Sequence, residues 1–366
     1  MKVSILSPSA SPNISVGIDT LEIAKILTRN NFATCIYAID WQTAHVDGIL
    51  SPRSYLDGTG SLDRNILIYQ HAIGWPMGDY LFKMSKDIKI VRYHNITPAH
   101  YFEKYSETYA TACRMGEKAI LGHVRNTDSW FWPVSNYNRI SLVQLGAAPS
   151  RCLVVPPFHA AEHMASTRPA RKFYRGGKGH GATILYVSAI RPHKGHVRAL
   201  DVFHKYQSQH DMDAQLIFAG TTDSSLSLYL DLLMDKVNRL NLQNNVRFAS
   251  NVSPSCLHGL YLDADVFLCM SEHEGFGLPL VEAMYFGLPI VALKGTAIPE
   301  TLGEAGIVLD GDNDEFVTAI LGLIRNRESA RVLQEFGRAR FQKYFRREVI
   351  EGELLLALHE TLAAAS

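Results

Sequence analysis

The segment SEHEGFGLPLVEAM, residues 271–284, holds the side chains of this sequence that are best suited to chemistry. Its carboxylates Glu274 and Glu282 are separated by seven residues, among them two glycines and a proline. In one continuous helix this spacing would hold them about 12 Å apart. If Glu274 instead lies in a loop before the helix, the two can contact different parts of one extended ligand. The alternative is structural: Glu282 would stabilise a helix N-terminus by roughly 0.3–1 kcal/mol, and Glu274 would be a solvated charge.

The flanking residues predict a strand, a loop and a helix around these carboxylates. The apolar run 265–270 predicts a buried strand, and Pro279 suits the first turn of a helix, where its missing N–H costs nothing. Gly287 suits the end of that helix. The loop therefore lies at the carboxyl end of a parallel strand, where open α/β sheets bind ligands. Gly275 and Gly277 carry no side chains, so backbone N–H groups can approach an anion at the helix N-terminus.

A second loop, SAIRPHKGH at residues 188–196, supplies cations. It follows the apolar run 182–188 and brings Arg191 and Lys194 to the end of another predicted strand. Cations beside a helix N-terminus are suited to binding a diphosphate. The alternative is an ordinary exposed basic loop.

Two strand ends in the first half carry weaker candidates. His94 and Asn95 end one predicted strand, and His71 and Trp75 follow another. Single histidines at strand ends are often structural. We therefore treat His71, Trp75 and Asn95 as weak candidates for binding a ligand.

Short apolar runs alternate with helical patterns along the chain, which predicts parallel sheets covered on both faces. We expect strands at 3–7, 35–39, 65–69, 88–94, 152–156, 182–188, 214–220, 245–250, 265–270, 289–293 and 306–310. Helices are expected between them, the first at about 17–29 and the last at about 347–365. The predicted class is α/β, with two doubly wound, Rossmann-like domains.

The domain boundaries follow from composition. We expect a first domain at 1–158, a polar and glycine-rich linker at 159–181, a second domain at 182–346 and a terminal helix at 347–366. The linker's GGKGHG segment has the glycines of a phosphate loop, but it precedes a strand instead of following one. We therefore interpret it as part of the linker.

Composition excludes several classes of protein. Basic and acidic residues number 36 each, so no net basic field favours binding to nucleic acid. Five scattered cysteines predict a reduced, intracellular protein without disulfides or a cysteine zinc site. KVSILSPS is a strand and a turn, not a signal peptide, and no uncharged apolar run reaches the ~18 residues of a membrane span. We expect a cytoplasmic protein whose membrane contact, if any, is peripheral.

Together these motifs resemble those of the retaining glycosyltransferases of family four, which have the GT-B fold. The family's signature E-x-F/Y-G, four residues and a second E is matched by EGFGLPLVE at 274–282, and FGLPIVA and GTAIPE follow in order. The resemblance is strongest over 182–310, and residues 134–157 are similar to the segment that closes the family's first domain. It implies two Rossmann-like domains whose parallel sheets face an interdomain cleft, with a terminal helix that crosses back to the first domain.

The resemblance also implies roles for individual residues. Glu274 would contact the donor sugar, Glu282 the ribose hydroxyls and Lys194 the diphosphate, with His94 near the transferring centre. The catalytic residues implied in this way are Glu274, His94 and Lys194. The donor-binding residues are Gly17, Arg191, Lys194, Glu274, Gly275, Phe276, Gly277, Leu278 and Glu282. His71, Trp75 and Asn95 would be weak candidates for binding the acceptor.

Two positions depart from the family pattern. Ala189 stands where the family has an arginine, so Arg191 is the expected substitute. Val16-Gly17 stands where the family has two glycines. Recognition of the base is expected around residues 249–252.

The predicted function is retaining transfer of a hexosyl unit from a UDP- or GDP-sugar to a saccharide or lipid-linked saccharide, with no metal and no cofactor. A D-x-D pair at 263–265 runs directly into a predicted strand, and His159 and His163 lack a third ligand. The alternatives are a GT-B enzyme of another reaction type, such as an epimerase or a phosphorylase, and a catalytically silent sugar-nucleotide-binding protein.

The acceptor region at 101–132 mixes aromatic and basic residues and leaves two interpretations open. It is either a peripheral surface for a lipid-linked polysaccharide at the inner face of the membrane, or a partly buried helix with a solvated basic side.

Overall fold

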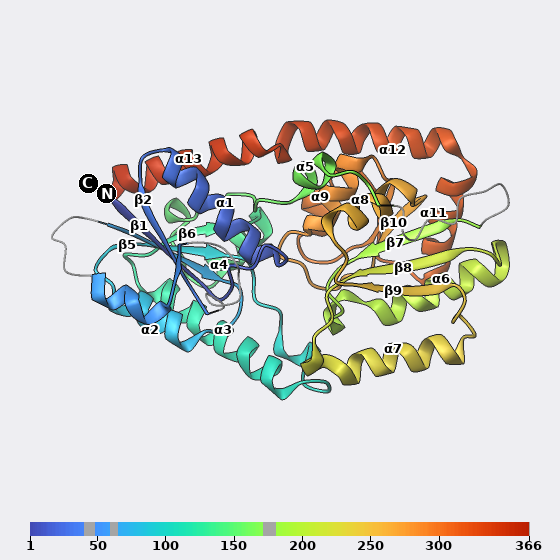
Figure 1. Ribbon diagram of the computed structural model, residues 1–366, viewed down its shortest axis with the longest axis horizontal. Helices are drawn as coiled ribbons and strands as arrows, with labels where there is room; N and C mark the ends of the chain where they lie inside the picture. The colour runs from blue at the N-terminus through green and yellow to red at the C-terminus, as the bar shows by residue number, and fades with distance from the viewer. Residues whose placement is uncertain (40–47, 59–64, 171–180, 366) are drawn as a thin grey trace. The chain divides into compact units, whose positions relative to one another are not determined.

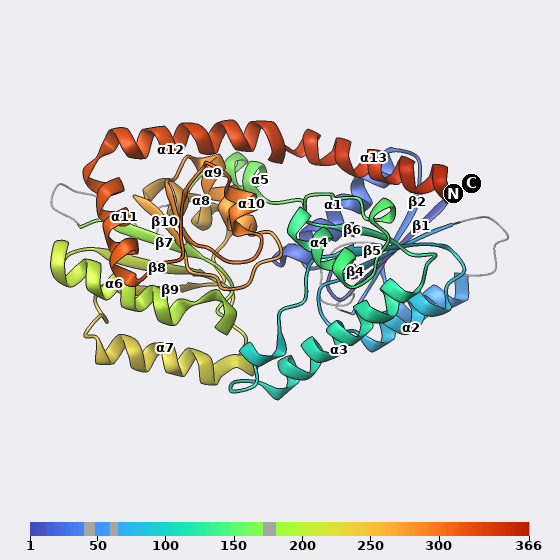
Figure 2. The ribbon, with the colours of Figure 1, turned by 180° about the vertical axis from the view of Figure 1, so that it is seen from behind.

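The computed structural model describes residues 1–39, 48–58, 65–170 and 181–365. They form two compact units, each with one six-stranded sheet (Figures 1 and 2). The first unit comprises residues 1–103, 107–159 and 346–366, and the second comprises 104–106 and 160–345.

The sheet of the first unit is parallel throughout, with the strand order β3-β2-β1-β4-β5-β6. Its strands are β1 (Lys2–Ser7), β2 (Ala33–Ala38), β3 (Ile49–Leu50), β4 (Ile66–His71), β5 (Ile88–Tyr93) and β6 (Trp130–Pro133). Its helices are α1 (Ser15–Arg29), α2 (Pro76–Met84), α3 (Glu107–Arg125), α4 (Asn136–Gln144) and α13 (Arg347–Ala365). This strand order is that of a doubly wound nucleotide-binding sheet, in which the order reverses between β1 and β4.

The second unit repeats this order, counted from its own first strand. Its parallel sheet runs β12-β11-β10-β7-β8-β9, so the reversal lies between β7 and β10. The strands are β7 (Thr183–Val187), β8 (Gln215–Gly220), β9 (Val246–Ser250), β10 (Val266–Cys269), β11 (Ile290–Leu293) and β12 (Ile307–Leu309). The helices are α5 (Ala161–Ser166), α6 (His196–His210), α7 (Ser227–Arg239), α8 (Pro254–Asp263), α9 (Leu278–Phe286), α10 (Ile298–Leu302), α11 (Asn313–Arg325) and α12 (Arg327–Arg340).

Helices cover both faces of each sheet (Figure 1). In the first unit α1 and α13 pack on the face that carries Ile66 and Ile68, while Tyr69 and His71 lie on the opposite face with α2 and α3. This alternation follows from the period of two along a strand. In the second unit α6, α7 and α11 form a core with one face of the sheet, and α8 and α9 lie on the other (Figures 1 and 2). Coverage on both faces explains why the strands read as continuous apolar runs.

The structure confirms the predicted class and ten of the eleven predicted strands, within the usual shift of a few residues at their ends. The predicted strand at 152–156 is wrong: this segment makes one isolated bridge, between Phe131 and Cys152. Pro156 and Pro157 have no N–H for a ladder. The sixth strand is instead β6, whose WFW sequence lies in the predicted acceptor region 101–132. Trp132 there is fully buried, so 101–132 holds a helix and a core strand, not one surface.

The linker expected at 159–181 contains a helix. Met164 of α5 is buried, and α5 packs against α8 and α9 within the second unit. The glycine segment GGKGHG, except for Gly181, lies outside the described residues.

The terminal helix α13 completes the core of the first unit. Ile350 and Leu354 are buried with α1 and the sheet, and Trp132 Nε1 donates to Thr361 Oγ1 at 3.3 Å. Among the described residues, no helix is long and apolar enough to cross a membrane.

A buried leucine of α13 and an exposed one allow a test of this packing. Leu354 is 0% exposed and Leu356 is 54% exposed. We expect Leu354→Ala to lower the free energy of unfolding by about 2–5 kcal/mol because it leaves a cavity, and Leu356→Ala to change it by less than about 0.5 kcal/mol. Urea unfolding followed by circular dichroism measures both, and equal losses in the two variants would contradict the packing.

Candidate active site

The two loops singled out in the sequence lie beside each other at the strand reversal of the second unit. One follows β7 and includes a short helical turn, Pro192–Lys194, before α6; the other connects β10 to α9. Their contact is close, because a Cβ on Gly195 would lie 2.0 Å from the Met270 carbonyl oxygen. Gly195 also has φ +66°, so this position requires glycine on two counts.

The contact joins the two strongest candidates. Lys194 Nζ lies 2.6 Å from Glu274 Oε1, and the side chains are only 16% and 13% exposed. Each charge is therefore held by the other in the unliganded chain. A ligand that offers an anion to Lys194 and hydroxyl donors to Glu274 can take over both interactions.

Buried hydroxyls hold the Glu274 loop in place. Thr296 Oγ1 accepts from Glu274 N and donates to Glu274 O, both at 2.7 Å. Thr301 Oγ1 donates to Phe276 O at 2.6 Å, and Tyr186, which accepts from Met270 N at 3.2 Å, also donates to the Lys194 carbonyl. These bonds fix the backbone on both sides of the ion pair.

The loop opens directly into α9. Gly277 precedes the helix with φ +94°, and Leu278 begins it. Phe276 is buried and packs its ring against Phe345, with centroids 5.7 Å apart. The side chain of Phe276 thus points into the fold, and its part of the loop offers backbone N–H groups at a helix N-terminus, which favours an anion.

Glu282 lies further along α9 in a different environment. It is 8% exposed, and its Oε2 accepts from the hydroxyl of Tyr261 on α8 at 2.7 Å. Burial raises the pKa of Glu282 to about 7, against a smaller lowering by the Tyr261 hydrogen bond. Glu274 and Glu282 therefore belong to separate contacts, one with Lys194 and one with Tyr261.

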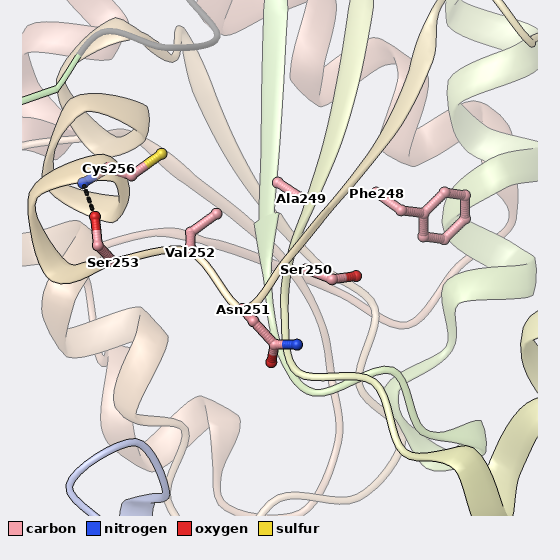
Figure 3. A pocket seen from close by; sticks show the side chains of 7 residues that line it. All are labelled: Phe248, Ala249, Ser250, Asn251, Val252, Ser253 and Cys256. Atoms are coloured by element: carbon pink, nitrogen blue, oxygen red, sulfur yellow. Dashed lines mark hydrogen bonds between the residues drawn. The ribbon is translucent and has the colours of Figure 1, made fainter.

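A pocket of about 320 Å³ lies at the carboxyl end of β9 and the start of α8 (Figure 3). It is lined by Phe248, Ala249, Ser250, Asn251, Val252, Ser253 and Cys256. Asn251 has φ +52° and donates its N–H to the Gly220 carbonyl at 3.1 Å, which turns the chain at the pocket wall. The volume is at the lower end of the ~300–1,000 Å³ range of ligand sites, and the lining includes all four residues 249–252 expected to recognise a base.

In the first unit His94 sits on a buried ion pair. Asp19 and Arg92 have fully buried side chains joined at 2.9 Å and 3.0 Å. His94 Nε2 lies 2.5 Å from Gln70 Oε1 and 3.6 Å from Asp19 Oδ2. Burial lowers the pKa of His94 to about 4; the Asp19 charge raises it and the Arg92 charge lowers it further. His94 is thus a neutral imidazole at pH 7, and Gln70 contacts its Nε2.

The remaining candidates in the first unit face inward. His71 is fully buried, and Trp75 is 5% exposed. Asn95 has φ +73°, and its Oδ1 accepts from Ile96 N at 2.8 Å, so its amide holds the turn. A Cβ on Gly17 would lie 2.0 Å from the Ser11 carbonyl oxygen, so the chain itself requires this glycine. The predicted ligand roles of these four residues stay predictions.

Comparison with known proteins finds a family match within the second unit. Residues 170–340 match the sequence model of the family described as "Glycosyl transferases group 1". Residues 170–340, which make up most of the second unit, are therefore similar in sequence to the group 1 glycosyltransferases. The predicted family resemblance is therefore confirmed over this part of the chain.

Two curated relatives are enzymes of glycan assembly. The chain is 27% identical over 192 residues to the O-antigen chain mannosyltransferase B of Escherichia coli, covering 51% of this chain and 49% of the relative. It is 36% identical over 100 residues to the GDP-mannose:cellobiosyl-diphosphopolyprenol alpha-mannosyltransferase of Komagataeibacter xylinus, covering 27% and 25%. The chain thus spans about half or less of the curated relatives that it matches.

Solved structures confirm the GT-B fold. The chain is similar to Anabaena Alr3699/HepE in complex with UDP-glucose, with a TM-score of 0.77 and 16% identity over 98% of this chain and 99% of that one. At this identity the likeness concerns the fold alone.

Sequence reasoning missed the residues that hold the glycosyltransferase loops together. Tyr186 and Tyr261 gave no signal, because each is one aromatic residue in an apolar pattern. Thr301 directly follows the GTAIPE motif and Thr296 lies in it, so the motif marked these threonines without showing that they bind the Glu274 loop. Arg191 lies on the Lys194 loop, and its carbonyl accepts from Lys194 N at 3.0 Å; its role toward a phosphate stays a prediction.

The raised pKa of Glu282 predicts a pH-dependent stability. Between the ordinary pKa of 4.5 and about 7, the folded chain holds a proton that the unfolded chain releases. Stability therefore falls as pH rises through this range, by about 3 kcal/mol at ~1.4 kcal/mol per pKa unit. Glu282→Gln has no carboxyl group to titrate. Its free energy of unfolding should therefore rise relative to that of the wild type between pH 5 and pH 8.

Urea unfolding at several pH values measures this difference. Glu304→Gln, which changes an exposed glutamate of the same unit, is the control and should run parallel to the wild type. A parallel course of Glu282→Gln and the wild type would contradict a buried, proton-holding Glu282.

Proposed function

We propose that this chain is a retaining glycosyltransferase that moves a hexosyl unit from a UDP- or GDP-sugar to a saccharide or lipid-linked saccharide. The observation that carries the proposal is the ion pair between Lys194 and Glu274 at the strand reversal of the glycosyltransferase domain. Ligands of doubly wound sheets bind outside the carboxyl ends of the strands at this reversal.

Lys194 would stabilise the leaving group. As the bond between the sugar's anomeric carbon and the diphosphate breaks, negative charge grows on the phosphate oxygen. The ammonium of Lys194 and the N–H groups at the start of α9 are positive partners for this charge, with Arg191 as a third. These groups supply the stabilisation that a metal would otherwise supply, which supports transfer without a metal.

The other residues would bind the rest of the donor. The carboxylate of Glu274 would accept hydrogen bonds from the sugar hydroxyls once the phosphate engages Lys194. Glu282, held by Tyr261, would bind the ribose hydroxyls, and the pocket at 249–252 would take the base. This assigns the two carboxylates to two different sugars of one extended ligand.

We propose front-face transfer as the source of retention. Glu274 is tied to Lys194 and to sugar binding, which leaves it unsuited to act as a nucleophile. The acceptor hydroxyl would attack from the side on which the diphosphate departs, so that a new bond to the anomeric carbon forms as the old one breaks. The hydroxyl proton passes to the departing phosphate oxygen.

The names of the relatives narrow the substrates. Two of them are mannosyltransferases, one with a diphosphopolyprenol acceptor in its name, and the HepE structure contains UDP-glucose. They support a hexosyl donor and an acceptor in glycan biosynthesis. They leave UDP and GDP as the two nucleotides to test.

Slow hydrolysis of the donor tests the proposal. The chain is incubated with UDP- and GDP-linked glucose, mannose, galactose and N-acetylglucosamine, and release of nucleoside diphosphate is followed. We expect one nucleotide sugar of this set to be turned over. When acceptor saccharides are added, the glycoside that forms should keep the anomeric configuration of the donor sugar. Nucleotide binding without turnover, even with acceptors, would overturn the enzyme assignment and favour a silent binding protein.

Lys194→Ala tests the assignment of the diphosphate. Removing one preorganised donor to the developing charge costs about 3 kcal/mol, so turnover should fall by roughly a hundredfold or more. The variant should stay folded but unfold at a somewhat lower temperature, because Glu274, which is 13% exposed, loses its partner. Lys205→Ala, which removes a lysine of α6 that pairs with Asp314 of α11, is the matched control and should keep its turnover. Turnover near that of the wild type in Lys194→Ala would remove the assignment.

A further inference from the structure

Three potential metal ligands meet inside the first unit, away from the loops of the glycosyltransferase domain in sequence. They are His71 at the end of β4, Asp79 in the first turn of α2 and His123 in the last turn of α3. Each offers one ligand atom, and these three atoms lie within 4.8 Å of one another. No spacing motif links these residues, so only the fold brings them together.

The imidazole of His71 is oriented as in a metal ligand. Its Nε2 lies 3.1 Å from the Gly116 carbonyl oxygen, which can only accept, so Nε2 carries the proton. Its Nδ1 then has a free lone pair, which is buried and has no hydrogen-bond partner among the described residues. Histidines that bind metals usually donate their other N–H to a carbonyl or a carboxylate in this way. A buried acceptor without a donor is costly, and a cation would satisfy it.

The other two ligands already face each other. His123 Nε2 lies 3.1 Å from Asp79 Oδ1, with side chains 10% and 23% exposed. The rings of His71 and His123 are perpendicular, with centroids 5.5 Å apart. The ring of Tyr69 contacts both imidazoles, with centroids 5.4 Å from that of His71 and 5.7 Å from that of His123. One carboxylate and two imidazoles therefore surround a small volume walled by aromatic rings.

The backbone holds the cluster rigidly. A Cβ on Gly74 would lie 2.4 Å from the Ala112 carbonyl oxygen, and one on Gly116 would lie 2.9 Å from Gly74 N. The loop between β4 and α2 therefore touches α3 backbone to backbone, reinforced by the hydrogen bond from Gly74 N to Ala112 O at 3.0 Å. This contact places the strand end and the two helices at a defined separation, which is the preorganisation that a metal site needs.

We propose that His71, Asp79 and His123 bind a divalent transition-metal ion, with Zn²⁺ as the best fit. Two imidazoles and a carboxylate are ligands that Zn²⁺ commonly takes, and three protein ligands leave a fourth position for water. Around a tetrahedral zinc the ligand atoms would lie about 3.3 Å apart. The present separation of up to 4.8 Å requires a closer approach by about 1.5 Å, which Asp79 at a partly exposed helix start can supply.

The metal would also brace the neighbouring strand end. The carbonyl of His71 accepts from the backbone N–H of His94 at 3.1 Å. A cation bound to the His71 ring would fix this residue and, through that bond, the start of the loop that carries His94. The role is structural and leaves the transfer chemistry of the proposed function to Lys194 and Glu274.

Metal binding to the intact chain tests the proposal. The chain is stripped with a chelator and dialysed, then titrated with zinc sulfate, and bound metal is measured by mass spectrometry after removal of free ion. We expect one Zn²⁺ per chain and a rise in the temperature of unfolding. Titration with Co²⁺ should give the visible absorption of a tetrahedral complex.

Variants assign the site. Asp79→Asn and His123→Gln preserve size and hydrogen bonding but remove a metal ligand. Losing a residue that only hydrogen-bonds a ligand already weakens metal binding by ~10–100-fold. Each variant should therefore weaken Zn²⁺ binding by at least this factor. His359→Gln, which changes an exposed histidine of the same unit, should bind like the wild type.

Two results would overturn the proposal. The first is that the stripped wild-type chain binds no Zn²⁺ and keeps its unfolding temperature at saturating zinc, since this measurement depends on no variant. The second is zinc binding that is as tight in correctly folded Asp79→Asn and His123→Gln as in the wild type.

Discussion

The ion pair between Lys194 and Glu274 is the interaction on which the candidate site depends. Its two charges come from loops after different strands, and they meet only because the strand order reverses between β7 and β10. Both side chains are largely shielded from water, so each needs the other while no ligand is bound. An anion alone would release Lys194 but leave Glu274 without a partner. A ligand with a phosphate next to a hydroxyl-rich sugar replaces both interactions, so the pair itself favours a sugar nucleotide over a free phosphate.

The first unit uses a buried ion pair at the corresponding reversal, with a different result. Asp19 reaches from α1 to Arg92 on β5, and the other N–H groups of Arg92 donate to backbone carbonyls that include Val155 and Pro156. Burial opposes ionisation of Asp19, but the Arg92 charge and hydrogen bonds outweigh it and keep its pKa below the ordinary value. With all its donors used, Arg92 is a fixed support. It holds the segment 152–156 near the sheet, where this segment also makes an isolated bridge to β6. Burial, and to a smaller extent the Arg92 charge, lowers the pKa of His94.

The sequence was sufficient for the features that depend on local pattern. Apolar runs located all but one of the expected strands, and the glycines and prolines around 274–287 located the loop and α9. The exceptions are tertiary. The run CLVVP is as apolar as a strand, but its carbonyls bind Arg92, 60 or more residues earlier in the sequence. The buried strand WFW is too short and too aromatic to be told from a helix end. No pattern in one sequence could show that Lys194 and Glu274, 80 residues apart, form one ion pair, or that Tyr261 meets Glu282.

The different states of Glu274 and Glu282 support the proposal that one segment serves two parts of a ligand. Glu274 lies in the loop, where Lys194 neutralises it, and Glu282 lies inside α9, where burial raises its pKa to about 7 and a phenol is its partner. Near neutral pH neither Glu274 nor Glu282 is then a free, unpaired carboxylate beside the place where we propose that a diphosphate binds. A second unpaired carboxylate beside Lys194 would repel the phosphates that the lysine attracts. Burial of Glu282 against Tyr261 would therefore favour the proposed anion binding at the start of α9, although the residue itself lies more than a helical turn away from it.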